Sequence, residues 1–156
     1  MQRSMRMRSP VLAVWLFVLI GLFGCGSVRL IAPYDQKTDE AVTNLQKSTA
    51  QFFTQIERQG GSSAQDYKNQ TKFYDDTKVM LSGLLVRANA LSLNAKTLQL
   101  LEILSEQYQK LEQQNKTIGI SQAAVPQLES AFNRTFTAIL TLEVAKKEPK
   151  QEGDGK

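Results

Sequence analysis

The stretch "YKNQTKFYDDTKVMLSGLLVRANAL" (67–91) decides the fold, because its apolar residues recur with a helical period. Four of them stand seven positions apart: Tyr67, Tyr74, Leu81 and Ala88. Three leucines fill the intervening turns: Leu84, Leu85 and Leu91. Side chains at this spacing share one face of an α-helix. Ser62 and Gln65 have the spacing of a capping box, which predicts a helix over 63–90. We interpret Gly83 as a point of close helix–helix contact rather than a break.

Three further segments carry the same periodicity and predict helices over 35–59, 95–116 and 121–146. The apolar positions of the first are Val42, Leu45, Phe52 and Ile56, with Thr49 filling the missing step. Those of the second are Leu98, Leu101, Leu104, Tyr108, Leu111 and Ile118. Those of the third are Val125, Leu128, Phe132, Ile139 and Leu142, with Ser121 as N-cap and Pro126 in the first turn. No segment shows a sustained alternation of period two.

Four amphipathic helices with short connections predict an all-α fold, an antiparallel up-down four-helix bundle over residues 35–146. Roughly 110 structured residues suffice for one hydrophobic core, so we expect a single domain. The last ten residues, "KEPKQEGDGK" (147–156), lack apolar side chains and are predicted to be a disordered tail.

The first 24 residues have the composition of a signal peptide. Residues 1–10 carry Arg3, Arg6 and Arg8 and no acid, and "VLAVWLFVLIGLF" (11–23) contains no charged residue. This is a basic n-region followed by an apolar h-region. A membrane-spanning helix needs about 20 apolar residues, so this run is too short to be a comfortable anchor.

The sequence Leu22-Phe23-Gly24-Cys25 resembles the lipobox of bacterial lipoproteins, and Cys25 is the only cysteine of the chain. The resemblance implies cleavage between Gly24 and Cys25 and a thioether-linked diacylglycerol on Cys25, usually with a further acyl chain on the new amino group. Two or three acyl chains hold a protein stably at a membrane lipid surface, whereas one chain is marginal. The alternative is an uncleaved signal anchor with a buried, inert cysteine.

Residues 25–34, "CGSVRLIAPY", are predicted to form the lipidated tether, in which Pro33 blocks a helix. In the lipoproteins that the leader resembles, an aspartate after the cysteine retains the protein in the inner membrane. This chain has Gly26 there. The resemblance therefore implies the inner leaflet of the outer membrane, with the bundle facing the periplasm. In a one-membrane host it implies the plasma membrane.

Composition argues against several function classes. The chain has 19 Lys and Arg against 15 Asp and Glu, and without the three leader arginines the ratio is 16 to 15. Nucleic-acid binding needs a concentrated basic face, so we expect no nucleic-acid partner. Histidine is absent, which excludes the Glu-x-x-His pairs of di-iron bundles, a His haem ligand and Ser-His or Cys-His nucleophile pairs. We expect no metal, no cofactor and no catalytic residue.

The densest carboxylate cluster adjoins Tyr74, at Asp75 and Asp76, and Arg87 follows about three turns later near the same helical face. Tyr74, Asp75, Asp76 and Arg87 are candidates for a polar recognition strip. The alternative is a solvated face with ordinary ion pairs. Arg134, which stands between Phe132 and Phe136, has the same two interpretations.

The phrase "FYDDTKVMLSGLLVRANAL" (73–91) is similar to that of small uncharacterised helical lipoproteins of proteobacteria, a resemblance that implies a class and no activity. Two functions remain. The first is a non-enzymatic envelope lipoprotein whose helices bind a partner protein or hold an assembly at the membrane. The second is a carboxylate-dependent hydrolytic enzyme of the envelope. Two carboxylates that converge in an apolar cleft with raised pKa values would favour the enzyme.

Overall fold

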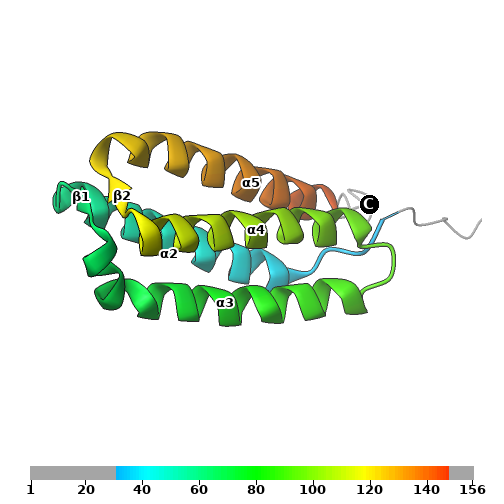
Figure 1. The fold of residues 1–156 in the computed structure, drawn as a ribbon. Coiled ribbons are helices and arrows are strands. Elements are labelled where there is room, and N and C mark those ends of the chain that lie inside the picture. The colour runs from blue at the N-terminus through cyan, green and yellow to red at the C-terminus, as the bar shows by residue number, and fades with distance from the viewer. Residues whose placement is uncertain (1–30, 148–156) are drawn as a thin grey trace, which may run out of the picture. The chain divides into compact units, whose positions relative to one another are not determined.

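Four helices form the body of the chain in a computed structural model, which describes residues 31–147. The helices are α2 (Gln36–Arg58), α3 (Tyr67–Ala90), α4 (Ala95–Thr117) and α5 (Val125–Ala145). Successive helices run in opposite directions (Figure 1), so the predicted all-α up-down bundle is confirmed. The predictions for the signal peptide, for Gly24, Cys25 and Gly26, and for the tail after Lys147 lie outside the described residues.

The helices form a closed ring in which each packs against the next and α5 packs against α2. The most extensive contacts join α3 to α4 and α2 to α5. Aromatic rings fill the space between α2 and α3, where Phe52 stacks on Phe73 with ring centroids 4.0 Å apart. Phe52 also meets Tyr74 edge to face at 5.7 Å. Such aromatic contacts stabilise a core beyond the area that they bury.

The predicted apolar stripes form the core, and most of their members are buried, among them Val42, Leu45, Ile56, Leu81, Leu84, Leu101, Leu104, Leu111 and Ile139. Phe53 and Phe136 are also fully buried, although they stand beside the predicted stripes. The prediction that Ile118 belongs to a buried stripe is wrong, because its side chain is 78% exposed. The reason is that α4 ends at Thr117 and Gly119, with φ +81°, turns the chain away from the helix axis.

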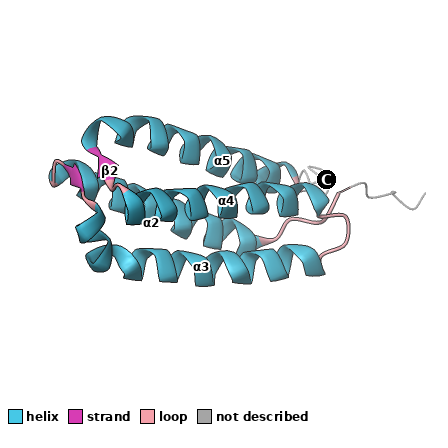
Figure 2. Ribbon diagram, viewed as in Figure 1, coloured by secondary structure: helices cyan, strands magenta, loops and turns pink. Residues whose placement is uncertain are grey.

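Two short strands join the hairpin loops at one end of the bundle (Figure 2), a feature that the sequence pattern did not predict. β1 (Gly61–Ser62) pairs antiparallel with β2 (Ile120–Ser121), and each strand leads into a 3-10 turn, Ala64–Asp66 and Gln122–Ala124. We call this the hairpin end.

The predicted starts of the second and fourth helices, at 63 and 121, are therefore four residues early. The predicted capping box of Ser62 with Gln65 is also wrong, because Ser62 is in a strand. The box is shifted by one position: the Asp66 carboxylate accepts hydrogen bonds from the Ser63 backbone N–H at 2.8 Å and from its hydroxyl at 2.7 Å.

The two halves of the bundle repeat one order of elements, helix, short strand, 3-10 turn and helix. Each hairpin loop contains a glycine with positive φ, Gly61 at +115° and Gly119 at +81°. A Cβ on Gly119 would come within 2.0 Å of the Ser62 carbonyl oxygen, so the two hairpin loops approach each other as closely as glycine allows.

Gly83 does not make the predicted close helix–helix contact. It is exposed, and a Cβ placed on it would meet no atom of a neighbouring element within 4 Å. Pro126 stands in the first turn of α5, as predicted.

Candidate functional site

The structure does not bring the predicted polar strip together. Tyr74 is buried, whereas Asp75 and Asp76 are exposed. Asp76 pairs with Lys72 of the same helix at 2.6 Å, and both side chains are mostly solvated. Such an i,i+4 pair on a helix surface contributes little to stability.

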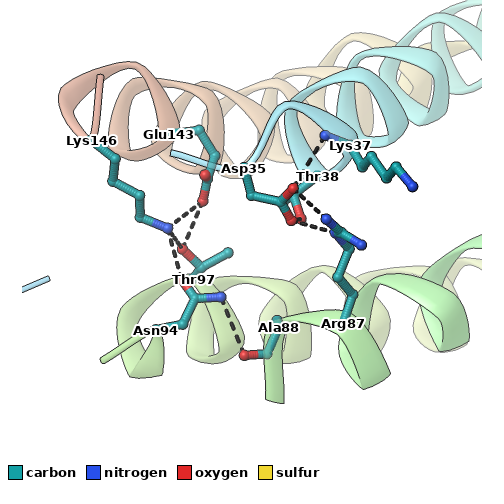
Figure 3. A network of polar contacts seen from close by, with 9 residues as sticks. All are labelled: Asp35, Lys37, Thr38, Arg87, Ala88, Asn94, Thr97, Glu143 and Lys146. Carbon is teal, nitrogen blue, oxygen red and sulfur yellow. Dashed lines mark hydrogen bonds and ion pairs between the residues drawn. The ribbon is translucent and has the colours of Figure 1, made fainter. Parts of the chain in front are cut away.

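The Arg87 side chain extends from α3 to the N-cap of α2 instead. Its guanidinium binds both carboxylate oxygens of Asp35, the N-cap of α2, with Nη2 at 2.6 Å from Oδ1 (Figure 3). The same carboxylate accepts the Thr38 hydroxyl at 2.7 Å and the Lys37 backbone N–H at 3.3 Å. The hydrogen bonds from Arg87 lower the pKa of Asp35 although partial burial acts to raise it. Arg87 therefore clamps the start of α2 to the end of α3.

Arg134 is exposed on α5, although Phe132 and Phe136 on either side of it are buried. It borders a shallow surface hollow together with Glu129 and Asn133. The position is a solvated helix face, since the helical period separates it from its buried neighbours.

A groove of about 250 Å³ lies between α3 and α4. Leu81, Leu85 and Val86 of α3 line it together with Tyr108 of α4. Polar residues also line it, Ser82 on α3 and Ser105 and Gln109 on α4. Serine side chains at these positions leave unfilled the space that larger apolar residues would occupy.

The tyrosines that line the groove direct their hydroxyl groups into the bundle. The Tyr74 hydroxyl accepts a hydrogen bond from Asn115 Nδ2 at 2.9 Å, and the Tyr108 hydroxyl is hydrogen-bonded to Thr49 of α2. Burial raises the pKa of both Tyr74 and Tyr108, so both stay neutral phenols at physiological pH. The tyrosine rings therefore add to the apolar part of the lining, which the aliphatic side chains of α3 supply.

Charged groups mark one end of the groove. Glu112 accepts hydrogen bonds from the Tyr67 hydroxyl at 2.8 Å and is 2.7 Å from Lys116 Nζ. Burial acts to raise the pKa of Glu112, but these hydrogen bonds outweigh it and the pKa is lowered. Lys78 also lines the groove; its charge acts to lower the pKa of Glu112, but it has no ion pair within residues 31–147. Glu112 is the single carboxylate among the residues that line this groove.

The solvent-facing side of α3 continues this apolar surface. Val79 is 73% exposed and Val86 is 69% exposed, and Gly83 stands between them at helical spacing. Val86 also lines the groove, so the two features are contiguous. Helix α3 therefore presents apolar side chains to solvent as well as to the core.

A buried ionic cluster closes the other end of the bundle, where α2 and α4 begin and α3 and α5 end (Figure 3). Lys146 Nζ is 2.6 Å from Glu143 Oε1 and donates to Asn94 Oδ1 and Thr97 Oγ1, each at 2.7 Å. Thr97 donates in turn to Glu143 at 2.8 Å. Glu143 Oε2 is buried without a hydrogen-bond partner in the described part of the chain. A buried pair of this kind is held by its partners, because each charge loses its hydration.

The segment before α2, residues 31–35, lies against this end; we call it the lead-in segment, and the end that it covers the lead-in end. The Ala32 backbone N–H donates to the Leu93 carbonyl at 3.1 Å, and Ala32 is buried. The Tyr34 hydroxyl donates to Asp39 at 2.7 Å, a bond that raises the pKa of Tyr34 to about 12. Lys147 Nζ stands 4.5 Å from the centre of the Tyr34 ring.

Leu93 has an unusual backbone in the loop that links α3 to α4. Its φ is +61°, in the left-handed region, which costs about 1–2 kcal/mol for a residue with a Cβ. Its side chain is 58% exposed. Glycine or asparagine would adopt this conformation more readily.

Sequence reasoning missed the buried polar residues, although a signal for them was present. Glu143 follows Ile139 by four residues and Asn115 follows Leu111 by four, so each continues an apolar stripe. Both are fully buried. A polar residue at a stripe position predicts a buried polar contact, because the helix places it on the inward face.

Comparisons with protein-family models, with curated proteins and with solved structures find no match for this chain. Within residues 31–147, none of the helices has the length and apolar character needed to cross a membrane. The same residues contain no group of three or more Cys, Asp or Glu side chains placed to hold a metal ion.

Proposed function

We propose that this chain is a lipid-anchored lipoprotein of the bacterial envelope, and that it works as a non-enzymatic module binding a partner protein in the α3–α4 groove. The groove is the observation that supports the binding role, because it combines an apolar lining with the exposed Val79 and Val86 beside it. Contiguous apolar surface of this kind is typical of interaction sites. The leader and Cys25 support the anchor.

The occupant that fits best is an amphipathic helix of another envelope protein. The groove follows residues 74–86 of α3, which corresponds to about 18 Å of helix. A helix of two to three turns presents apolar side chains at i, i+3 or i+4 and i+7 over that length. Lys78 lines the groove and has no ion pair among the described residues, so an acidic residue beside the apolar face of the partner would complement it.

The test is crosslinking from the groove in living cells. A photoreactive residue at Ser82 or at Ser105 is expected to give one discrete adduct with a partner protein. The same residue at Asn133, an exposed position of α5 that does not line the groove, is the matched control and is expected to give none. Mass spectrometry of the adduct should locate the bond in a predicted helix of the partner.

Variants then connect the adduct to the apolar surface. Val86→Asp places a charge at the groove and is expected to abolish the Ser82 adduct, whereas Val144→Asp, at another exposed valine, should leave it unchanged. Equal adducts from Ser82 and Asn133 would contradict the groove as the site. An adduct made of two copies of this chain would overturn the proposal of a separate partner.

The membrane that holds the protein follows from Gly26 in this proposal. An aspartate is absent after Cys25, so we place the protein at the outer membrane of a two-membrane host, facing the periplasm. Density-gradient fractionation of the wild type beside Gly26→Asp tests this directly. The variant is expected to move to the inner membrane. A wild type that already sediments with the inner membrane would contradict the sorting argument while the lipid anchor could stand.

A further inference from the structure

Two exposed apolar residues stand on hydrogen-bonded segments at the lead-in end. Leu93 is 58% exposed and Ile31 is 46% exposed. The hydrogen bond from the Ala32 backbone N–H to the Leu93 carbonyl, at 3.1 Å, joins the backbone beside them. Leu93 keeps its side chain outward on a left-handed backbone that leucine rarely adopts. A polar residue would be expected at an exposed loop position with no contact to make.

The charges around these two residues are mainly positive. Lys37, Lys96 and Lys147 are exposed at this end. The acids close to them are engaged: Asp35 binds Arg87, Asp39 accepts the Tyr34 hydroxyl and lies 3.8 Å from Lys147 Nζ, and Glu143 is buried with Lys146. Glu40, an exposed acid one turn further along α2, accepts a hydrogen bond from Gln36. Apolar side chains within a rim of lysines suit the headgroup region of an anionic lipid surface.

The chain itself brings this end close to a bilayer if Cys25 is lipidated. Ile31 is only six residues after Cys25, so the link between them spans at most about 20 Å. The lead-in segment is held against the bundle by the Ala32 and Tyr34 hydrogen bonds. The lead-in end is therefore the part of the bundle with the shortest link along the chain to Cys25.

We propose that the lead-in end is a lipid-docking surface, with Leu93 and Ile31 at headgroup depth and Lys37, Lys96 and Lys147 among the phosphates. This inference rests on the lipid attachment under Proposed function. Docking would stand the helices away from the membrane, because all four helices end or begin at this surface (Figure 1). The α3–α4 groove would then be held at a fixed distance from the bilayer surface, and the hairpin end would point away from the bilayer.

The experiment uses tryptophan as a depth probe, since the only tryptophan, Trp15, lies in the predicted leader. Leu93→Trp and Ile118→Trp are made in the full chain, purified from membranes and reconstituted in vesicles of phosphatidylethanolamine with a minority of phosphatidylglycerol. Ile118 is the matched control, an apolar residue that is 78% exposed next to the hairpin end. Nitroxide-labelled lipids quench a tryptophan that reaches the headgroup region.

We expect quenching at position 93 to exceed that at position 118 by about two-fold or more, with a blue-shifted emission at 93 only. Ile31→Asp in the Leu93→Trp background should reduce the quenching, whereas Ile118→Asp should not. Equal quenching at 93 and 118 would overturn the proposal, because a bundle that tumbles on its tether favours neither end. An insensitive Ile31→Asp variant would also overturn it. A thermal melt confirms that each variant is folded.

Two further measurements distinguish a failure of the lipid anchor from a failure of docking. Mass spectrometry of the Cys25 peptide from the purified protein shows whether it carries acyl chains. In a second arm, the chain beginning at Cys25 is coupled through its thiol to a maleimide lipid, which tethers it without cellular lipidation. Preferential quenching at 93 in this arm supports docking even if the native peptide is unmodified. Equal quenching in this arm contradicts docking even if the native peptide is lipidated.

Discussion

The two ends of the bundle bury polar groups in different ways. At the lead-in end, Lys146 and Glu143 form an ion pair that is almost completely buried. At the hairpin end the buried network is neutral: Asn115 donates to Tyr74 at 2.9 Å, and the Ser62 hydroxyl donates to Asn115 at 3.0 Å. A buried charge that loses its partner is far more costly than a neutral group that does so. The lead-in end therefore depends on a few charged side chains, whereas the hairpin end depends on neutral hydrogen bonds and on the close fit of its backbone.

The largest expected effect is the loss of the cation at the lead-in end. Lys146→Met leaves the Glu143 carboxylate buried without its counter-charge and should lower the free energy of unfolding by about 3–5 kcal/mol. Urea unfolding followed by circular dichroism measures it. Lys147→Met is the matched control, because the Lys147 side chain is 50% exposed, and should cost less than about 1 kcal/mol. Equal losses in the two variants would contradict a buried pair.

A double replacement sharpens the same point. Glu143 Oε2 has no hydrogen-bond partner among the described residues, so the pair is incompletely satisfied. The double variant Glu143→Leu/Lys146→Met removes both charges. It should recover most of the stability that Lys146→Met loses, since no isolated charge remains. A double variant that is no more stable than the single one would show that the charge is not the cause.

The hairpin end should be most sensitive at its backbone. Gly119→Ala forces a Cβ to within 2.0 Å of the Ser62 carbonyl oxygen on a positive φ, so we expect a loss of about 3 kcal/mol in the free energy of unfolding. Gly60→Ala has a similar φ, +74°, with no atom within 4 Å, and should cost only about 1 kcal/mol. Chemical denaturation compares the two. Similar losses would mean that the close approach of the hairpin loops is unimportant.

The neutral network should matter less than the ionic one. Asn115→Ala removes a donor to Gln70 and Tyr74 and should cost about 2 kcal/mol in the free energy of unfolding. Asn133→Ala, at an exposed position of α5, should change it by less than about 0.5 kcal/mol. A loss at Asn115 as large as that of Lys146→Met would remove the contrast between the ends.

The smallest expected effect is a change in acid sensitivity at the lead-in end. The folded-state pKa of Asp35 is lowered by its hydrogen bonds from Arg87, so its stabilisation is present above about pH 4 and is lost as the pH falls through the folded pKa. Asp35→Asn keeps a good N-cap but should flatten the decline of stability on the acid side. Thermal melts across this pH range measure the slope. An unchanged slope would show that the ion pair to Arg87 contributes nothing.

Much of the fold could be predicted from the sequence, because the information is periodic. The seven-residue recurrence from Tyr67 to Ala88 and its counterparts placed four helices and most of the core correctly. The hairpin loops could not be predicted in this way. Two-residue strands such as Gly61–Ser62 are too short for a period, and their pairing joins segments that are far apart in sequence. The nearby serines suggested helix caps, since serine favours both caps and turns.

The candidate site was harder to predict than the fold. Tyr74 and Arg87 are polar residues in the sequence, but which neighbour each one contacts depends on the packing of α2 and α4. Ser82 and Ser105 line the groove from two different helices, and that juxtaposition has no local signal. Buried polar residues on the stripes, such as Glu143, were the one tertiary feature that spacing could have revealed.

Metabolic labelling with an alkyne fatty acid tests the central claim, the lipid anchor on Cys25, most directly. The wild type and a Cys25→Ala variant are labelled in growing cells, purified and coupled to a fluorophore. We expect label on the wild type, and on the variant no label together with an uncleaved leader that retains Trp15. Label that persists on Cys25→Ala would contradict the anchor, as would a wild type that carries none.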